Sequence, residues 1–300
     1  MYRRHFIAPN PYIFVMTLAI LFITFFALYY MQGIALSKVT GYNIEQNIFF
    51  GADHLEPFWG WVRHHKGDHP LLLLMEVPLT NLLATVFPRR LYCTLMVNAF
   101  WGSLGILLSF FFFRQLTQHL ASSVLLTVLF GLSASQLLFS SLPESYSFSA
   151  LAIIITYFLF LFTLQRGRIY PGLWVAAGVL TLGVVVTDFA QTLICFAIAL
   201  FAVERERRKI YVLLQYIGAV FLVVLALNML QKFLLGGQSM IDLRVYLYET
   251  TYLKPLVFSH PVLVAKEIFS NFFLLNIVFA FLHICRIFVN SPEPSFHNIG

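Results

Sequence analysis

Side chains that could take part in chemistry gather in two polar stretches of this sequence, each between long apolar runs. The first stretch, from Phe50 to Leu71, holds the carboxylates, imidazoles and amine of Asp53, His54, Glu56, His64, His65, Lys66, Asp68 and His69. The second stretch, Ser140–Tyr146, has Glu144 at its centre. A carboxylate beside an apolar segment carries a desolvation cost that a partner or a function must offset. Asp53 and Glu144 are therefore candidates for general-base chemistry.

Both stretches also have structural interpretations, and the residues alone leave these open. Asp53 and Asp68 could cap short helices in a solvated loop. Ser141 and Glu144 have the spacing of a capping box, which predicts a helix that starts at Pro143. A capping carboxylate at the mouth of a membrane span can still face a substrate, so the two interpretations of Glu144 are compatible.

The histidines of the first stretch raise the question of a metal ion. His65 and His69 are four residues apart and would share one face of a helix, as a zinc pair requires, with Asp68 beside them. Gly67 and Pro70 oppose a regular helix there. The sequence thus predicts no required cofactor, with a divalent ion bound by His65, Asp68 and His69 as the open alternative.

The composition says which elements must hold these groups. The 300 residues are 60% hydrophobic and 11% charged, with a mean hydropathy of +0.82. A soluble domain carries about a quarter charged residues, so this class is excluded. The net charge is +6, and the basic residues lie beside apolar runs. This placement indicates a role in membrane topology and in contact with anionic lipid, not in binding nucleic acid. We expect an all-α polytopic membrane protein with a single transmembrane domain over residues 1–300.

The apolar runs define about eight transmembrane helices. A span needs about 20 apolar residues, and the clear candidates are Pro11–Gln32, Leu91–Phe113, Ser122–Ser140, Ser147–Leu164, Ile210–Leu235 and Asn271–Val289. The run Pro171–Val203 is too long for one span. It is expected to form two short helices that meet at Thr187-Asp188-Phe189.

The distribution of basic residues decides whether the ambiguous segment Leu71–Phe87 crosses the membrane. If this segment does not cross, the positive-inside rule is met by Arg3, Arg4, Arg114, Arg166, Arg168, Arg205, Arg207, Arg208, Lys209 and Arg286. If it crosses, several of these residues fall outside. We therefore expect a non-spanning apolar helix in a long first external loop of about 33–90, and a second external loop of about 236–270.

In this order, the features resemble the GT-C superfamily of membrane glycosyltransferases, close to the protein O-mannosyltransferase and aminoarabinose transferase branch. Asp53 matches the acidic residue of that family's first outer loop. The element Asp68-His69-Pro70-Leu71 is similar to its His-Pro-Pro-Leu element, with the second proline absent. Arg89 or Arg90 matches the arginine before the second span, and Glu144 matches the acidic residue of a later outer turn.

The resemblance implies an inverting enzyme that moves a sugar from a polyprenyl-phosphate donor to an acceptor at the outer face. Asp53 would be the catalytic base and Glu144 a second acidic residue, while the lipid phosphate would be held by Arg89, Arg90, Lys66 and His69. Guanidinium groups bind phosphate in a bidentate manner, although Arg89 and Arg90 could instead reach lipid headgroups. The secondary candidates are Glu56, Asp68, Asp188 and Tyr146.

The expected partners are the polyprenyl-phosphate-linked sugar and membrane lipids, with no nucleic acid. The expected location is a bacterial cytoplasmic membrane, with the active site on its periplasmic face. A non-enzymatic lipid or solute transporter of flippase type is the alternative, and it would place polar groups near the midplane of several spans.

Overall fold

The computed structural model describes residues 10–38, 48–49, 52–53, 70–204 and 208–235, and these are almost wholly helical. Their elements in chain order are α1 (Pro11–Leu36), β1 (Ile48–Phe49), β2 (Ala52–Asp53), α2 (Pro70–Ala84), α3 (Arg90–Thr117), α4 (Leu120–Gly131), α5 (Ala134–Phe139), α6 (Tyr146–Arg166), α7 (Pro171–Val184), α8 (Val186–Val203) and α9 (Lys209–Leu235). The two strands form one antiparallel pair in which Ile48 lies opposite Asp53.

Five of these helices are long and apolar enough to cross a membrane: α1, α3, α6, α8 and α9. The helices α4 and α5 together would make a sixth span with a bend of 63°. The expectation of a helical, multi-pass membrane protein is confirmed at this level. The count of about eight spans stays a prediction, because Asn271–Val289 and the second external loop lie outside the described residues.

The predicted span Ser122–Ser140 is interrupted, which hydropathy does not reveal. The helix α4 ends at Gly131, and Ser133 caps α5 through its hydroxyl, which accepts from the Gln136 N–H at 3.4 Å. The carbonyl that this break frees accepts a hydrogen bond from the Tyr29 hydroxyl at 2.9 Å. A buried carbonyl needs such a donor, so the side chain from α1 makes the break tolerable.

The run Pro171–Val203 forms two helices as expected, but they meet at Val185 and not at Thr187-Asp188-Phe189. Val185 has an extended backbone (φ −141°, ψ 120°), a conformation that β-branched residues favour. Asp188 then falls in the first turn of α8, where the helix dipole favours a negative charge.

The directions of the helices follow from contacts near their ends. Gln115 of α3 bonds Gln165 of α6 at 2.7 Å near both carboxyl ends, so these helices run parallel. The helix α1 runs antiparallel to α3, because Phe14 lies 5.8 Å from Phe110 and Gly33 lies against Leu95. Since α1 ends where α3 begins, the chain between them returns to the end it left.

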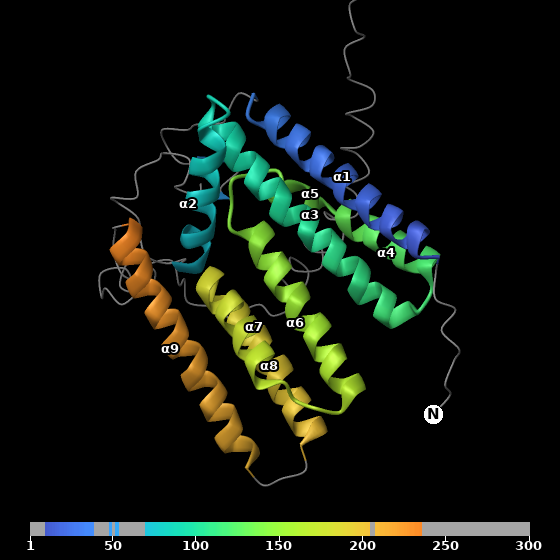
Figure 1. The fold of residues 1–300 in the computed structure, drawn as a ribbon, viewed down its shortest axis with the longest axis vertical. Helices are drawn as coiled ribbons and strands as arrows, with labels where there is room; N and C mark the ends of the chain where they lie inside the picture. The colour runs from blue at the N-terminus through green and yellow to red at the C-terminus, as the bar shows by residue number, and fades with distance from the viewer. Residues whose placement is uncertain (1–9, 39–47, 50–51, 54–69, 205–207, 236–300) are drawn as a thin grey trace, which may run out of the picture.

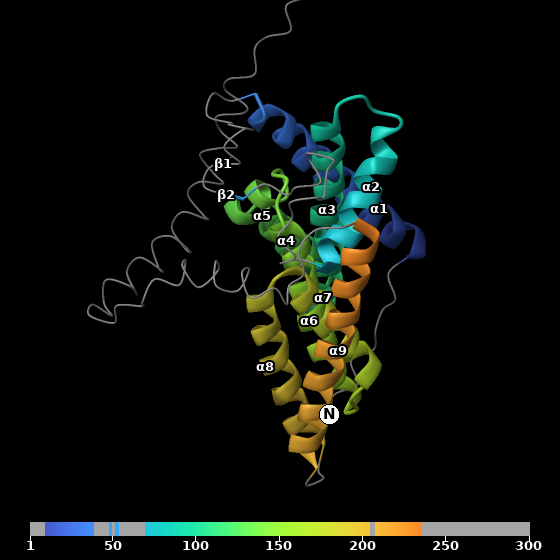
Figure 2. The same cartoon turned by 90° about the vertical axis from the view of Figure 1, so that its left-hand side faces the viewer.

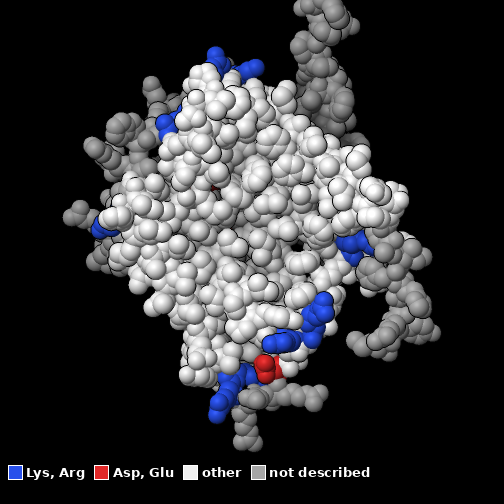
Figure 3. All heavy atoms as spheres, viewed as in Figure 1, with Lys and Arg blue, Asp and Glu red and all other residues white. Residues whose placement is uncertain are grey.

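This arrangement is consistent with the basic-residue pattern, and α2 stays a predicted non-spanning helix. At 15 residues and 1.5 Å per residue it is also short for a crossing. The carboxyl ends of α3, α6 and α8 lie at the same end of the molecule, which we call the basic end. Its basic residues are Arg114, Arg166, Arg168, Arg208 and Lys209. Figure 3 shows basic side chains at opposite ends of the molecule with a broad uncharged surface between them.

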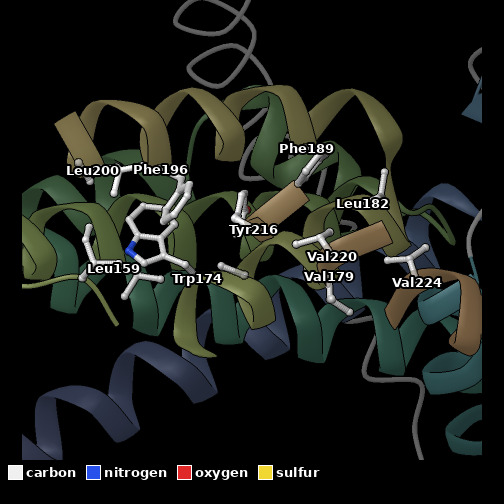
Figure 4. Packing of buried hydrophobic residues seen from close by; sticks show 13 residues of the cluster. Leu159, Trp174, Val179, Leu182, Phe189, Phe196, Leu200, Tyr216, Val220 and Val224 are labelled. Atoms are coloured by element: carbon white, nitrogen blue, oxygen red, sulfur yellow. The ribbon is translucent and has the colours of Figure 1, made fainter. Parts of the chain in front are cut away.

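The helices form two groups that α2 connects. Figure 1 shows α1, α3 and α4 on one side of α6, and α7, α8 and α9 on the other. The second group packs around Trp174, Phe196 and Tyr216 (Figure 4). The Trp174 indole N–H donates to the Thr163 hydroxyl at 3.1 Å. The helix α2 contacts α3, α7 and α9 at the end opposite the basic end (Figure 2).

A labelling experiment checks that α2 does not cross the membrane. In a variant without Cys93, Cys195 and Cys285, Gly67→Cys and Val86→Cys should react with an impermeant thiol reagent from the same side. Gly172→Cys, at the start of α7, should react from the other side. Labelling of Gly67→Cys and Val86→Cys from opposite sides would show that α2 crosses.

Candidate functional site

The turn between α5 and α6, residues Ser140–Ser145, is the most polar buried segment of the described chain. We call it the α5–α6 turn. The Asn98 side chain of α3 holds it: its amide nitrogen donates to the Phe139 carbonyl at 2.8 Å and to the Leu142 carbonyl. The Asn98 amide oxygen accepts from the Ser147 hydroxyl at the start of α6. Asn98 is fully buried, so these bonds satisfy backbone groups that water cannot reach.

Two glycines let the α5–α6 turn approach its neighbouring helices. A Cβ atom at Gly102 of α3 would lie 2.5 Å from the Cβ of Ser140, and one at Gly33 of α1 would lie 2.7 Å from the Ser141 carbonyl oxygen. Real Cβ atoms do not make such contacts, so both positions require the absence of a side chain. The turn is thereby fixed against α1 and α3.

Glu144 lies buried in this turn, with 4% of its surface exposed. One of its carboxylate oxygens accepts from the Ser145 backbone N–H at 3.1 Å. The capping-box prediction is wrong: α6 starts at Tyr146, and the Ser141 hydroxyl donates back to the Leu137 carbonyl at 2.7 Å. Ser141 thus closes α5 instead of opening α6, which leaves Glu144 outside the cap.

Glu76 of α2 is the second carboxyl group of the site, and sequence reasoning missed it. Its side chain has 0% exposure, and neither of its carboxyl oxygens has a hydrogen-bonding partner among the described residues. Burial, and then the negative charge of Glu144, raise the pKa of Glu76 to about 8. Leu72 and Met75 of α2 share one hydrophobic cluster with Phe148 near the start of α6, so the two carboxyl groups lie in the same region of the bundle.

The sequence did hold a signal for Glu76. The buried positions of α2 follow a helical period through Leu72, Leu73, Glu76, Val77 and Thr80. Glu76 lies in the middle of this stripe and therefore faces the bundle. Without the helical face, a carboxylate in the apolar segment Leu71–Phe87 gives no sign of whether it is buried.

The arginine pair lies at the same end as the site, with its side chains directed differently. Arg89 is exposed, donates to the Tyr92 hydroxyl at 3.0 Å and lies 5.4 Å from the centre of that ring. Arg90 is half-buried and donates to the Asn81 side-chain oxygen of α2. Arg90 therefore ties the far end of α2 to the start of α3.

The two secondary candidates among the described residues flank the start of α6. Asp188 is half-buried and accepts a hydrogen bond from the Ser149 hydroxyl, so it is not an isolated carboxylate between two helices. Tyr146 is 47% exposed, and its ring lies 4.6 Å from that of Phe139. The structure thus brings Glu144, Glu76 and Asp188 around one helix start.

The remaining candidates lie outside what the structure describes. Asp53 is placed only by its backbone, in β2, and nothing is described of its side chain. The residues outside the described ranges are Glu56, His65, Lys66, Asp68 and His69. Among the described residues, no group of three or more His, Cys, Asp or Glu side chains could hold a metal ion. The proposed ligands His65, Asp68 and His69 are not covered by that finding.

Comparison with protein-family models, curated proteins and solved structures finds no match for this chain.

Replacing Asn98 tests what holds the α5–α6 turn. Asn98→Leu removes the donor to two buried carbonyls, and each unsatisfied group costs roughly 1–3 kcal/mol. We expect the thermal midpoint of the detergent-solubilised protein to fall by at least about 5 °C. Asn81→Leu, at an exposed position, should change it much less, and equal effects of the two substitutions would contradict this role of Asn98.

The two helical glycines Gly102 and Gly218 should respond in opposite directions to alanine. Nothing lies within 4 Å of a Cβ atom at Gly218, so Gly218→Ala should stabilise the protein by about 0.5–1 kcal/mol through helix propensity. Gly102→Ala forces the α5–α6 turn away from α3 and should destabilise it by about 1–3 kcal/mol. Thermal unfolding measures both, and stabilisation by Gly102→Ala would disprove the close contact.

Proposed function

We propose that this protein is a GT-C-type membrane glycosyltransferase, which moves a sugar from a polyprenyl phosphate to an acceptor at the end opposite the basic end. The observation that carries the proposal is Glu144, a carboxylate buried in a rigid turn at the end where the non-spanning α2 meets Arg90. By the positive-inside rule, the basic end faces the cytoplasm and this site faces the periplasm.

The proposed reaction is a single displacement at the anomeric carbon. The acceptor oxygen or nitrogen forms a bond to this carbon, and the bond from the carbon to the phosphate oxygen breaks. Asp53 takes the acceptor proton, and the lipid phosphate leaves with the bonding electron pair. Glu144 orients the acceptor or Asp53. Arg89 and Arg90, with Lys66 and His69, stabilise the charge that develops on the phosphate.

The structure supports this arrangement in two respects. Arg90 lies at the amino end of α3, at the same end of the molecule as Glu144, and a guanidinium group can bind phosphate in a bidentate manner. Arg90 also bonds α2, the helix that brings Glu76 to Glu144. The phosphate-binding arginine and the buried carboxylates are thereby linked through one short helix.

A transporter is the second candidate, and one observation favours it. Asn228 and Gln231 of α9 are buried, and α9 packs against α2, which carries the buried Glu76. Polar groups inside several packed helices are typical of transport sites. A transporter would move its substrate between compartments without a change in covalent structure.

Two substitutions test the catalytic assignment. Asp53→Asn keeps the size of the side chain and removes its basicity, so sugar transfer should fall by about two powers of ten or more. Glu144→Gln keeps an acceptor for the Ser145 N–H and should also lower transfer. The measurement is transfer of labelled sugar from a polyprenyl-phosphate donor in proteoliposomes, with Glu204→Gln at the basic end as the control.

Binding of the donor should survive Asp53→Asn, because the phosphate contacts lie elsewhere. Full turnover by Asp53→Asn would remove Asp53 as the base. Movement of labelled donor across the bilayer without covalent transfer would favour the transporter instead.

A further inference from the structure

The strongest unassigned feature is the face of α2 that carries Glu76 and Thr80. These residues are one helical turn apart, and both are wholly buried. The Thr80 hydroxyl, like the Glu76 carboxyl group, has no hydrogen-bonding partner among the described residues. A buried polar group without a partner is costly, and two on one face indicate that this face has a role beyond packing.

Among the described residues, few charges near Glu76 could balance an ionised carboxylate. The helix α7 has no ionisable side chain. On α3, Arg90, Tyr92 and Cys93 lie near the end of α2, where Arg90 bonds Asn81. On α9, Tyr216 packs against Phe196 of α8, and Lys232 is exposed. The charge that acts on Glu76 is the negative one of Glu144.

Glu144 is better placed than Glu76 to hold that negative charge. It accepts the Ser145 N–H and stands two residues before α6, where the positive end of the helix dipole favours an anion. Glu76 lies within α2, where its own helix offers no free N–H group. When two interacting carboxyl groups share a site, one of them keeps its proton.

We propose that Glu76 and Glu144 are a coupled carboxyl pair, in which Glu76 keeps its proton so that Glu144 holds the negative charge, and that Glu76 is thereby the positioning residue of the proposed active site. This inference rests on the proposed function for its consequence in catalysis. The pair itself stands on the complete burial of Glu76, on its lack of a partner among the described residues, and on the packing of Leu72 and Met75 of α2 in one cluster with Phe148 of α6. Asn81 of α2 also accepts a hydrogen bond from Arg90. The helix α2 therefore connects the two carboxyl groups to the arginine that is proposed to bind the phosphate.

The pair makes stability depend on pH in a defined direction. Burial raises the pKa of Glu76 from 4.5 to about 8, so between these values unfolding releases a proton. The stability that the protonated Glu76 contributes is therefore present in full below about pH 4.5 and is lost as the pH rises through about 8. Above that pH, two negative charges repel each other and loosen α2 from the α5–α6 turn.

The first test needs no enzyme activity and uses the full chain in detergent. The infrared band of a protonated carboxylic acid should be present near neutral pH and should disappear as the pH rises through about 8. Glu76→Gln should abolish the band, and Glu204→Gln should leave it unchanged. A band that persists in Glu76→Gln, or no band in the wild type at about pH 6, would overturn the pair.

The second test separates positioning from mere packing. Glu76→Gln is neutral at every pH and keeps a polar group of the same size near Glu144, so sugar transfer near neutral pH should stay within a few-fold, while the fall in rate at alkaline pH should vanish. Glu76→Leu removes this polar group and should lower transfer by at least about tenfold. Normal transfer by Glu76→Leu with an unchanged pH profile would overturn the positioning role.

The two tests also distinguish failure of this inference from failure of the proposed function. If the wild type shows the titrating band and no sugar transfer, the pair stands and the glycosyltransferase proposal falls. If Glu76→Leu does not fold, the pH profile of Glu76→Gln still decides the role. An alkaline limb that persists in Glu76→Gln contradicts it.

Discussion

A carbonyl group that leaves the helical ladder inside an apolar bundle must find a donor, because no water is there to replace it. This constraint governs the break at Gly131 and the α5–α6 turn. The Gly131 carbonyl is satisfied by the Tyr29 hydroxyl, and the carbonyls of Phe139 and Leu142 by the Asn98 amide. Val185 keeps its own N–H bonded to the Thr181 carbonyl at 2.9 Å while its backbone extends. The α5–α6 turn, and with it Glu144, therefore exists where it does because α3 offers Asn98.

A turn held in this way controls the electrostatics of the carboxylate it carries. Glu144 is removed from water and kept beside a backbone donor, so its charge acts strongly on other groups nearby. This charge acts on Glu76 of the short helix α2. The helix α2 is fixed by its contacts with α3, α7 and α9. The close contacts at Gly33 and Gly102 hold the α5–α6 turn tightly against α1 and α3. The rigid backbone thus fixes the position of the Glu144 charge and, through it, the protonation of Glu76.

The sequence was sufficient for features that hydropathy and charge govern, and insufficient for those that depend on tertiary hydrogen bonds. The helical, multi-pass class was predictable, since apolar length indicates spans, while the direction of each span across the membrane stays a prediction. The break at Gly131 was not, because it depends on Tyr29, more than a hundred residues away. The capping box at Ser141 failed since the same serine closes α5. Glu76 could not be identified as a site residue from the sequence, because a single carboxylate in an apolar run does not indicate which face of the helix is buried. Asp53, Lys66 and His69 stay predictions.

The short helices explain why polar groups meet at one level of the bundle. The helices α5 and α7 end inside it, and α6 and α8 begin beside those ends and run in parallel, joined by Ser149 and Asp188 and by Thr156 and Thr192. A bundle of full-length spans would place every helix start at the lipid headgroups. Here two helix starts, each with its positive dipole end, lie together, and each has an acidic residue: Glu144 before α6 and Asp188 in α8. Glu76 comes from the middle of a helix and lacks this compensation, so its complete burial favours keeping the proton.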